Sequence, residues 1–517
     1  MKFPIFAAAV LLTGLRLSAA VAVTTWHNDP GRTGVNANET VLTTANVNSA
    51  TFGKLYSLPV DGQIYAQPLY VPGVTIPASN PAHGIHNVLY VATENNSVFA
   101  FDADSATPLI LWQRNFGLGV SNVNGVWQIG ILSTPVIDTG RQAIYFVVDS
   151  LVNGQPSFSL HALDITTGAD KVGSPAVIAG SVPGTGDGSV GGTLTFSAAQ
   201  NLQRPALLEL NGGIFIGFGS HGDEAPYHGW LFEYDGVTLR RLALKCLSPD
   251  GYGASIWQSG GGLSADTGGN IYFSTGNGTF NPPTGDYGDS VIKIHPAAGL
   301  GIASSFTPVL AEFFRESDYD LGAGNVVVIP SSVVQVSPLL LTGGKDGHTY
   351  LTNSGNLGGF QLGLGLTDLV AQEWTGVFGH FGGNVFYNNS LYTWNSFDVM
   401  RIYSFNGLEL TPSFVGTQEQ LHTLQNAPAL SISANGMTGN GAILWAAHSL
   451  TYTDGGNYPG ILHAYDAQTG AELWNSNTEA DAPGAWAKWV PPTIVNGKVY
   501  LATFDSGVAV YGLRAGQ

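Results

Sequence analysis

Cysteine is almost absent from this chain of 517 residues, in which Cys246 is the only one. A single cysteine excludes an intramolecular disulfide, a Cys-x-x-Cys-His haem attachment and a cysteine-based metal cluster. Charged residues are also scarce, at 10% of the chain against about 25% in ordinary globular proteins. The few charged side chains are therefore the ones to follow in a search for chemistry.

Basic residues are even scarcer than acidic ones. The chain has 18 lysine and arginine residues against 36 aspartate and glutamate residues, which gives a net charge of −18 at pH 7. Nucleic-acid binding depends on lysine and arginine side chains that neutralise phosphates, and no basic patch is visible. The composition thus excludes nucleic acid as a partner, and the acidic surface chiefly indicates solubility.

Long apolar runs are absent beyond the first residues. Lys2 precedes an apolar stretch, Phe3 to Leu15, and the small residues Ala20-Val21-Ala22 follow it. This order predicts a signal peptide over residues 1–22. The apolar stretch is too short for a membrane span, and no later one reaches about 18 residues. We therefore expect a secreted or periplasmic protein, monomeric and without a membrane span.

One strand pattern recurs along the chain. In IYFSTGNGTF, Ile271 to Phe280, an apolar strand runs into the turn Thr275-Gly276-Asn277-Gly278. Neighbouring copies lie roughly 52 to 70 residues apart, a period typical of propeller blades. Seven other stretches share the pattern: VLYVATE, AIYFVVD, GIFIGFG, PLLLTGG, SLYTWNS, AILWAAH and KVYLATF, which end at Glu94, Asp149, Gly219, Gly344, Ser396, His448 and Phe504.

This period predicts an all-β fold, an eight-bladed β-propeller, with seven blades as the alternative. Each unit needs its neighbours to bury its faces, so residues 23–517 are expected to form a single domain. The strand at 52–60 stands apart from the first blade and is expected to close the ring by completing the last blade. Residues 26–40 have no periodicity and are interpreted as a surface arm. The expected blades are 63–116, 127–178, 200–247, 254–308, 320–360, 376–415, 426–477 and 484–513.

A resemblance appears in HAYDAQTGAELW, His463 to Trp474. Its aspartate, Thr-Gly pair and tryptophan resemble the tryptophan-docking repeat of quinoprotein (pyrroloquinoline quinone, PQQ) propellers. The stretches at 100–112 and 162–168 carry the repeat in part. Aspartate and Thr-Gly favour a tight turn, and the indole is expected to pack between blades. The resemblance covers nearly the whole chain after residue 22 and implies a propeller like that of the quinoprotein alcohol dehydrogenases.

Polar residues gather at two positions of the predicted blades. The loop between a blade's second and third strands and the connection entering the next blade emerge on the same face of the ring, because antiparallel strands alternate in direction. That face is expected to carry Glu94, Asp149, Glu224, Asn277, Lys345 and Asp505 on the loops, and Arg204, Trp257, Glu316, Asp318, Asp320, His380, Asn384 and Lys488 on the connections.

The family resemblance implies roles for part of this face. Glu224 and Asn277 match calcium ligands of catalytic quinoproteins, and oxygen ligands suit a hard cation. Trp257, in ASIWQSGGG, resembles the tryptophan that stacks under the quinone, and Lys345, in TGGKDG, resembles the lysine that reaches its oxygens. Arg204 would balance the carboxylates of PQQ, and Asn384 is a weaker match to a cofactor contact.

The catalytic aspartate is less well matched. In ESDYDLGAGN, the pair Tyr319-Asp320 stands where the family has Trp-Asp, and the preceding aspartate position falls on Ser317. Asp318 or Asp320 could serve as general base instead. The adjacent cysteines of the alcohol-oxidising members are also absent. If the site works, the resemblance implies oxidation of an alcohol or sugar hydroxyl with PQQ and calcium, and transfer of electrons to an external acceptor.

Each of these residues also has a structural interpretation. Asn277 between two glycines is a typical left-handed turn residue, and Trp257 is suited to packing between blades. Glu224 and Lys345 can be solvated loop charges. The alternative hypothesis is therefore a non-catalytic secreted propeller that binds a glycan, a peptide or an assembly partner through the same polar face.

Overall fold

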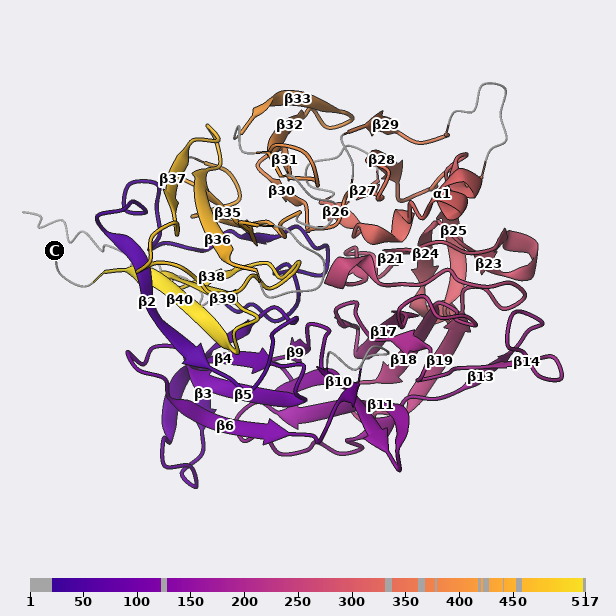
Figure 1. Ribbon diagram of the computed structural model, residues 1–517, viewed down its shortest axis with the longest axis horizontal. Coiled ribbons are helices and arrows are strands. Elements are labelled where there is room, and N and C mark those ends of the chain that lie inside the picture. Colours follow the sequence, from indigo (N-terminus) through magenta and orange to yellow (C-terminus); the bar gives the residue numbers. More distant parts are fainter. Residues whose placement is uncertain are drawn as a thin grey trace, which may run out of the picture.

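The computed structural model describes residues 21–121, 128–330, 337–360, 368–376, 379–416, 420–421, 427–439, 441–451 and 458–514. Eight antiparallel sheets follow one another along the chain and stand around a ring (Figure 1). The expected eight-bladed propeller is thus confirmed, and the seven-bladed alternative is wrong. Most of the expected signal peptide lies outside the described residues, as do residues 127 and 426, where the second and seventh blades were expected to begin.

The first four blades occupy the N-terminal half of the chain. The first blade consists of β3 (Leu69–Ile76), β4 (Gly84–Ala92), β5 (Ser97–Asp102) and β6 (Ile110–Asn115), and the second of β9 (Val136–Asp138), β10 (Ala143–Val152), β11 (Gln155–Asp164) and β12 (Ala176–Val177). The third consists of β15 (Asn201–Leu202) with β16 (Leu208–Leu210), β17 (Gly213–Ser220), β18 (Trp230–Asp235) and β19 (Arg241–Cys246). The fourth consists of β20 (Ser264–Ala265), β21 (Ile271–Ser274), β24 (Val291–His295) and β25 (Gly301–Phe306).

The last four blades follow the same order. The fifth blade consists of β26 (Val327–Ile329), β27 (Leu339–Gly343), β28 (His348–Asn353) and β29 (Gln372–Thr375), and the sixth of β30 (Val385–Tyr387), β31 (Ser390–Thr393), β32 (Arg401–Phe405) and β33 (Leu410–Val415). The seventh consists of β34 (Ser431–Ser433), β35 (Ile443–Ser449), β36 (Gly460–Asp466) and β37 (Glu472–Asn475). The eighth consists of β38 (Thr493–Val495), β39 (Lys498–Ala502), β40 (Gly507–Leu513) and β2 (Phe52–Pro59).

Short elements decorate the ring. They are β1 (Val35–Asn36), the pairs β7 (Val120–Ser121) with β8 (Gln128–Ile129), β13 (Ser181–Pro183) with β14 (Thr193–Thr195) and β22 (Phe280–Asn281) with β23 (Asp286–Tyr287), the 3-10 turns η1 (Gln258–Gly260), η2 (Pro282–Thr284), η3 (Pro296–Ala298) and η4 (Leu321–Ala323), and the helix α1 (Ala311–Ser317). Within the described residues, no helix is long and apolar enough to cross a membrane.

The N-terminal strand closes the ring as expected. Strand β2 pairs antiparallel with β40, from Phe52 opposite Leu513 to Pro59 opposite Gly507. In Figure 1 the indigo β2 lies beside the yellow β40. The eighth blade therefore consists of strands from both ends of the chain, which leaves the ring without an open edge between its first and last blades.

The docking repeat packs one blade on the next. Trp112 of the first blade donates from its indole nitrogen to the carbonyl of Ile165, 3.0 Å away, in the turn after β11. Gly168 ends that turn with φ of +68°, and a Cβ there would lie 2.7 Å from the Trp112 ring. The Thr-Gly step is thus required both by the left-handed turn and by the indole against it.

The expected surface arm is wrong. Trp26, His27 and Arg32 are at most 2% exposed. Residues 23–36, which we call the inner segment, form hydrogen bonds with the first strand of every blade or with the residue just before it. A segment this short reaches all eight blades because their first strands face the centre of the ring. Its partners are, in blade order, Tyr70, Ile137, Leu207, Ala265, Val328, Phe386, Ile432 and Ile494.

Arg32 holds the inner segment in place. Its guanidinium donates to the carbonyls of Leu263 at 2.9 Å, Trp26 at 2.8 Å and Leu207 at 3.2 Å, and to the Thr25 hydroxyl at 2.6 Å. Turn-rich sequence without periodicity normally runs over the surface, because buried backbone must be paired. Here the inner strands and Arg32 supply those partners, so the segment can be buried.

Candidate functional site

A pocket of about 280 Å³ brings together six of the fourteen residues expected on one face of the ring. It is formed by the connections that enter the third, fourth and fifth blades and by the loops that follow β17, β21 and β27. Its lining residues are Leu202, Arg204, Ser220, Gly222, Asp223, Tyr227, Ser255, Trp257, Asn277, Asp318, Asp320 and Lys345. The family resemblance gave a cofactor, metal or catalytic role to eight residues, and six of these therefore share one pocket.

The backbone around the pocket fixes where its carboxylates lie. Helix α1 ends at Ser317, and Asp318 caps it in the left-handed conformation with φ of 57°. Two residues later Asp320 precedes η4 and turns toward the loop after β21. There, a Cβ on Gly276 would lie 2.6 Å from the Asp320 carboxylate. The glycine before Asn277 is thus needed for this close approach.

Lys345 and Asn277 hold both carboxylates. The Lys345 Nζ lies 2.6 Å from Asp320 Oδ2 and 3.1 Å from Asp318 Oδ2. The backbone amide of Asn277 donates to Asp320 Oδ1 at 2.7 Å, and its side-chain Nδ2 donates to Asp318 Oδ1 at 3.0 Å. All four carboxylate oxygens therefore have a donor, whereas Oδ1 of Asn277 is buried without a partner among the described residues.

The two carboxylates differ in environment. The Asp318 side chain is 75% exposed, whereas that of Asp320 is 12% exposed. Burial raises the pKa of Asp320 above its ordinary value, although the charge of Lys345 and the Asn277 amide act against this. Burial lowers the pKa of Lys345, but the two aspartates outweigh it, so that its pKa is raised. Lys345 is therefore charged throughout the physiological range, and Asp320 is a carboxylate that can take up a proton.

Asp289 is a site residue that the sequence did not indicate. It is 1% exposed, and its Oδ1 accepts a hydrogen bond from the amide of Leu321, directly after Asp320. Burial raises its pKa well above the ordinary value, and the charge of Asp320 adds to the effect. Asp289 thus fixes the backbone at Asp320 through its hydrogen bond with the next amide. Its position after β23 carries no motif, so only its place in the fold reveals it.

Arg204 brings a positive charge without a counter-ion. It is 6% exposed, and no ion pair involves it within the described part of the chain. Its guanidinium donates only to the carbonyls of Leu132 at 3.3 Å and Lys488 at 3.4 Å, and lies 5.3 Å from the centre of the Tyr65 ring. Burial lowers its pKa to about 10. A buried charge with such weak partners favours an anionic ligand.

The pocket that contains Arg204 also has an aromatic ring in its wall, that of Trp257. Trp257 is half-buried in the pocket wall, and its ring centre lies 5.7 Å from that of Trp489 at an interplanar angle of 53°. Trp489 in turn stacks on Phe381, with centres 5.5 Å apart. The exposed part of the Trp257 indole provides a flat apolar surface beside Arg204.

Two of the singled-out residues do not line this pocket. Glu224 is exposed, and its neighbour Asp223 takes the place in the wall, where it accepts a hydrogen bond from the Ser220 hydroxyl. Asn384 is buried in the connection entering the sixth blade, outside the lining. Ser255, two residues before Trp257, lines the pocket instead. A one-residue difference in a loop is beyond what motif matching can resolve.

The donor set does not fit a calcium ion. Calcium takes about six to eight oxygen ligands. Within the described ranges, no group of three or more histidine, cysteine, aspartate or glutamate residues is placed to hold a metal. Glu224 is exposed and does not line the pocket, and the oxygens of Asp318 and Asp320 accept from Lys345 and Asn277. Of Asp318, Asp320 and Asn277, only Asn277 has a side-chain oxygen without a partner among the described residues.

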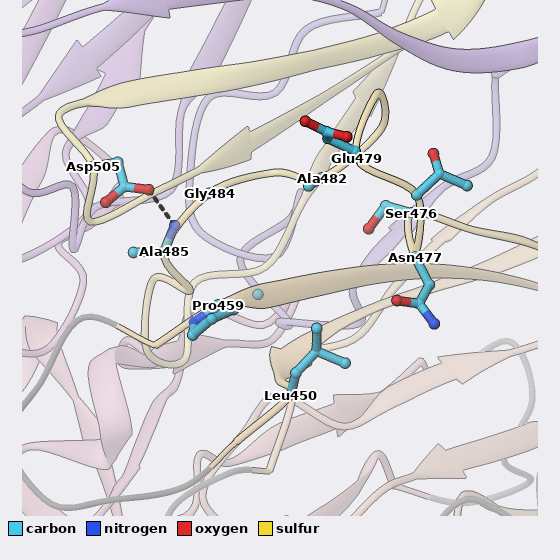
Figure 2. Close-up of a pocket in the computed structure, with 11 residues that line it drawn as sticks. Leu450, Pro459, Ser476, Asn477, Glu479, Ala482, Gly484, Ala485 and Asp505 are labelled. Carbon is cyan, nitrogen blue, oxygen red and sulfur yellow. Dashed lines mark hydrogen bonds between the residues drawn. The ribbon is translucent and has the colours of Figure 1, made fainter.

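A second hollow of about 440 Å³ lies between the seventh and eighth blades (Figure 2). Glu479 and Asp505 are its only charged residues, and Asp505 accepts a hydrogen bond from the Ala485 amide. The other labelled residues are uncharged, and of these only Ser476 and Asn477 have polar side chains. Among the described residues that line this hollow there is no cation and no aromatic ring, in contrast to the smaller pocket.

Comparison with known proteins supports the fold. No family model and no curated protein matches the sequence. Among solved structures, the quinohemoprotein alcohol dehydrogenase ADHIIG of Pseudomonas putida HK5 is similar over 96% of this chain and 81% of its own, with a TM-score of 0.61 and 12% identity. The chain therefore has the fold of the quinoprotein dehydrogenases, as the docking repeat indicated.

Two further structures are similar. A europium-containing methanol dehydrogenase matches 92% of this chain and 81% of its own, with a TM-score of 0.49 and 15% identity. Sqt1 of Saccharomyces cerevisiae matches 90% and 100%, with a TM-score of 0.50 and 8% identity. Similarity at these identities shows the fold alone, so function must be argued from the pocket.

Proposed function

We propose that the pocket binds PQQ and that the protein is an oxidoreductase acting on the hydroxyl group of an alcohol or a sugar. The observation that carries this proposal is the buried Arg204, which has no counter-ion among the described residues and lines the same pocket as the half-buried Trp257. A flat molecule that carries carboxylates matches both features at once. The fold shared with an alcohol dehydrogenase gives further support.

Different pocket residues would contact different groups of PQQ. Trp257 supports the ring system, and Arg204 pairs with a carboxylate in the charge-assisted way that guanidinium groups favour. Lys345 also lines the pocket, and its ammonium group would stabilise negative charge on an oxygen of the ligand. Asn384 takes no role here, because it lies outside the lining.

In the proposed reaction, Asp320 is the general base. Its carboxylate would take the proton of the substrate hydroxyl, and PQQ, when bound, would supply the acceptor for the hydride of the adjacent carbon. Lys345 keeps the Asp320 carboxylate ionised, and Asn277 orients it through the 2.7 Å hydrogen bond. Asp318 is more exposed and serves to hold Lys345 and Asn277. The electrons then pass to an external acceptor, and we place the reaction outside the cytoplasm.

The experiment is dye-linked oxidation of a panel of alcohols and sugars by the protein loaded with PQQ. Asp320→Asn keeps the shape of the residue but removes the base, so we expect kcat to fall by about 100-fold or more, with PQQ binding retained. Asp223→Asn is the matched control, since it lines the same pocket but does not contact Lys345. Equal activity of wild type and Asp320→Asn would contradict the assigned base.

A second candidate is a non-catalytic propeller that binds a glycan through the same face. The pocket volume favours it, since about 280 Å³ lies just below the roughly 300 to 1,000 Å³ usual for small-molecule sites. This candidate predicts glycan binding that does not require PQQ. An oligosaccharide array probed with the wild type and with Trp257→Ala separates the two functions.

A further inference from the structure

The pocket holds its two carboxylates with a cation that belongs to the chain. We infer that Lys345 supplies, in place of a divalent metal ion, the fixed positive charge that binds Asp318 and Asp320 in this pocket. The inference rests on the proposed function only for the use of that charge in catalysis. The arrangement of the charges does not depend on any quinone.

The contacts of Lys345 support this inference. Its Nζ lies within 3.1 Å of one oxygen of each aspartate, and the remaining two oxygens accept hydrogen bonds from Asn277. A metal ion would therefore have to share these oxygens with the Lys345 ammonium group, whose positive charge would repel it. The ammonium group is also only 14% exposed, so water competes weakly for its hydrogen bonds.

Asn277 is oriented for a lysine-centred site. Its Nδ2 donates to Asp318, and this contact fixes which way the amide faces, since the reversed amide would place oxygen against a carboxylate. Its Oδ1 is then directed away from Asp318 and stays without a partner among the described residues. One amide oxygen is far from the six to eight oxygens that calcium takes.

Replacement of Lys345 by methionine should change the metal affinity of the pocket. Lys345→Met removes the ammonium group but leaves Asp318, Asp320 and the Asn277 oxygen at the same place. Two adjacent carboxylates without a counter-ion repel each other and favour a divalent cation. Loss of Lys345 should therefore create calcium affinity that the wild type lacks. Lys171→Met is the matched control, because Lys171 pairs at 2.7 Å with one carboxylate, Asp164, outside the pocket.

The test is calorimetric titration of the quinone-free protein with calcium chloride after removal of metal by EGTA. We expect no saturable heat at this pocket up to 1 mM calcium for the wild type and Lys171→Met, and an affinity at least 10-fold higher for Lys345→Met. Wild-type binding that disappears in Asp320→Asn would overturn the inference, whether or not Lys345→Met folds. Equal calcium affinity of Lys345→Met and wild type would also contradict it.

The wild-type titration separates this inference from the proposed function. It contains no PQQ, so a protein that fails to bind the quinone still reports whether calcium occupies the pocket. Lys345→Arg provides a second variant that keeps the charge, and it should remain as insensitive to calcium as the wild type. Calcium affinity gained by Lys345→Arg would show that the charge of residue 345 does not keep the metal out.

Discussion

At the residue scale, the proposed function depends on how burial and one lysine set the protonation of Asp320. The side chain is nearly buried, which raises its pKa, while the charge of Lys345 at 2.6 Å opposes that rise. A general base must be ionised to accept a proton, so activity requires a pH above this pKa. The Asp320–Lys345 contact therefore decides the acid side of the pH profile.

The pH profile of kcat/KM tests this dependence. We expect the rate to rise with pH through the pKa of Asp320, which lies above the ordinary value of 3.8. Lys345→Met removes the positive neighbour that lowers this pKa, so the acidic limb should move to higher pH. The profiles are measured with EGTA present, so that calcium cannot replace the lysine charge. A limb that stays or moves to lower pH would contradict the assigned roles.

Single residues also mark the limit of prediction from sequence. Trp257, Asn277 and Lys345 could be placed in one pocket because each follows or precedes a strand with a clear pattern, and antiparallel alternation sends those ends to one face. Glu224 could not be distinguished from Asp223, since the choice depends on the conformation of a loop. Asp289 lies in a buried turn without any sequence signal.

At the element scale, the inner segment is the part of the fold that the sequence did not reveal. Its residues have no apolar period, and its partners are backbone groups of strands hundreds of residues away. Strand β2 was predictable, because eight copies of one pattern need a closing strand and residues 52–60 were the one apolar run left over. Long-range backbone pairing without periodicity gives no comparable signal.

Arg32 tests the structural role of the inner segment. Arg32→Met keeps much of the side-chain volume but removes donors to three carbonyls in a buried site, so we expect a loss of about 3 kcal/mol in the free energy of unfolding. Urea denaturation measures it. Arg240→Met, at an exposed position, should change the value by less than about 0.5 kcal/mol. Equal effects at both positions would mean that the inner segment adds little stability.

At the scale of the whole molecule, local and overall charge oppose each other. The buried Arg204 has no counter-ion among the described residues and can attract an anionic ligand, whereas Lys345 is paired with Asp318 and Asp320 and the whole protein carries a net charge of −18. Long-range repulsion is screened by salt, while contacts with the buried Arg204 are screened much less. The overall charge should therefore slow the approach of PQQ without preventing its binding.

Stopped-flow association at increasing ionic strength tests this balance. We expect the association rate constant of PQQ to rise severalfold between about 10 and 150 mM salt, because the Debye length shortens from about 30 to 8 Å. The dissociation rate constant should change less. An association rate that falls with salt would show that the pocket cations dominate the field at long range.

The central claim is that the pocket is a PQQ site, and equilibrium titration with PQQ tests it most directly. Quenching of tryptophan fluorescence follows occupancy, since Trp257 lines the pocket and Trp489 adjoins it. We expect saturable 1:1 binding that weakens at least 10-fold in Arg204→Met and in Trp257→Ala and is unchanged in Arg240→Met. No saturation by the wild type at concentrations well above micromolar, or equal affinity in all variants, would contradict the claim.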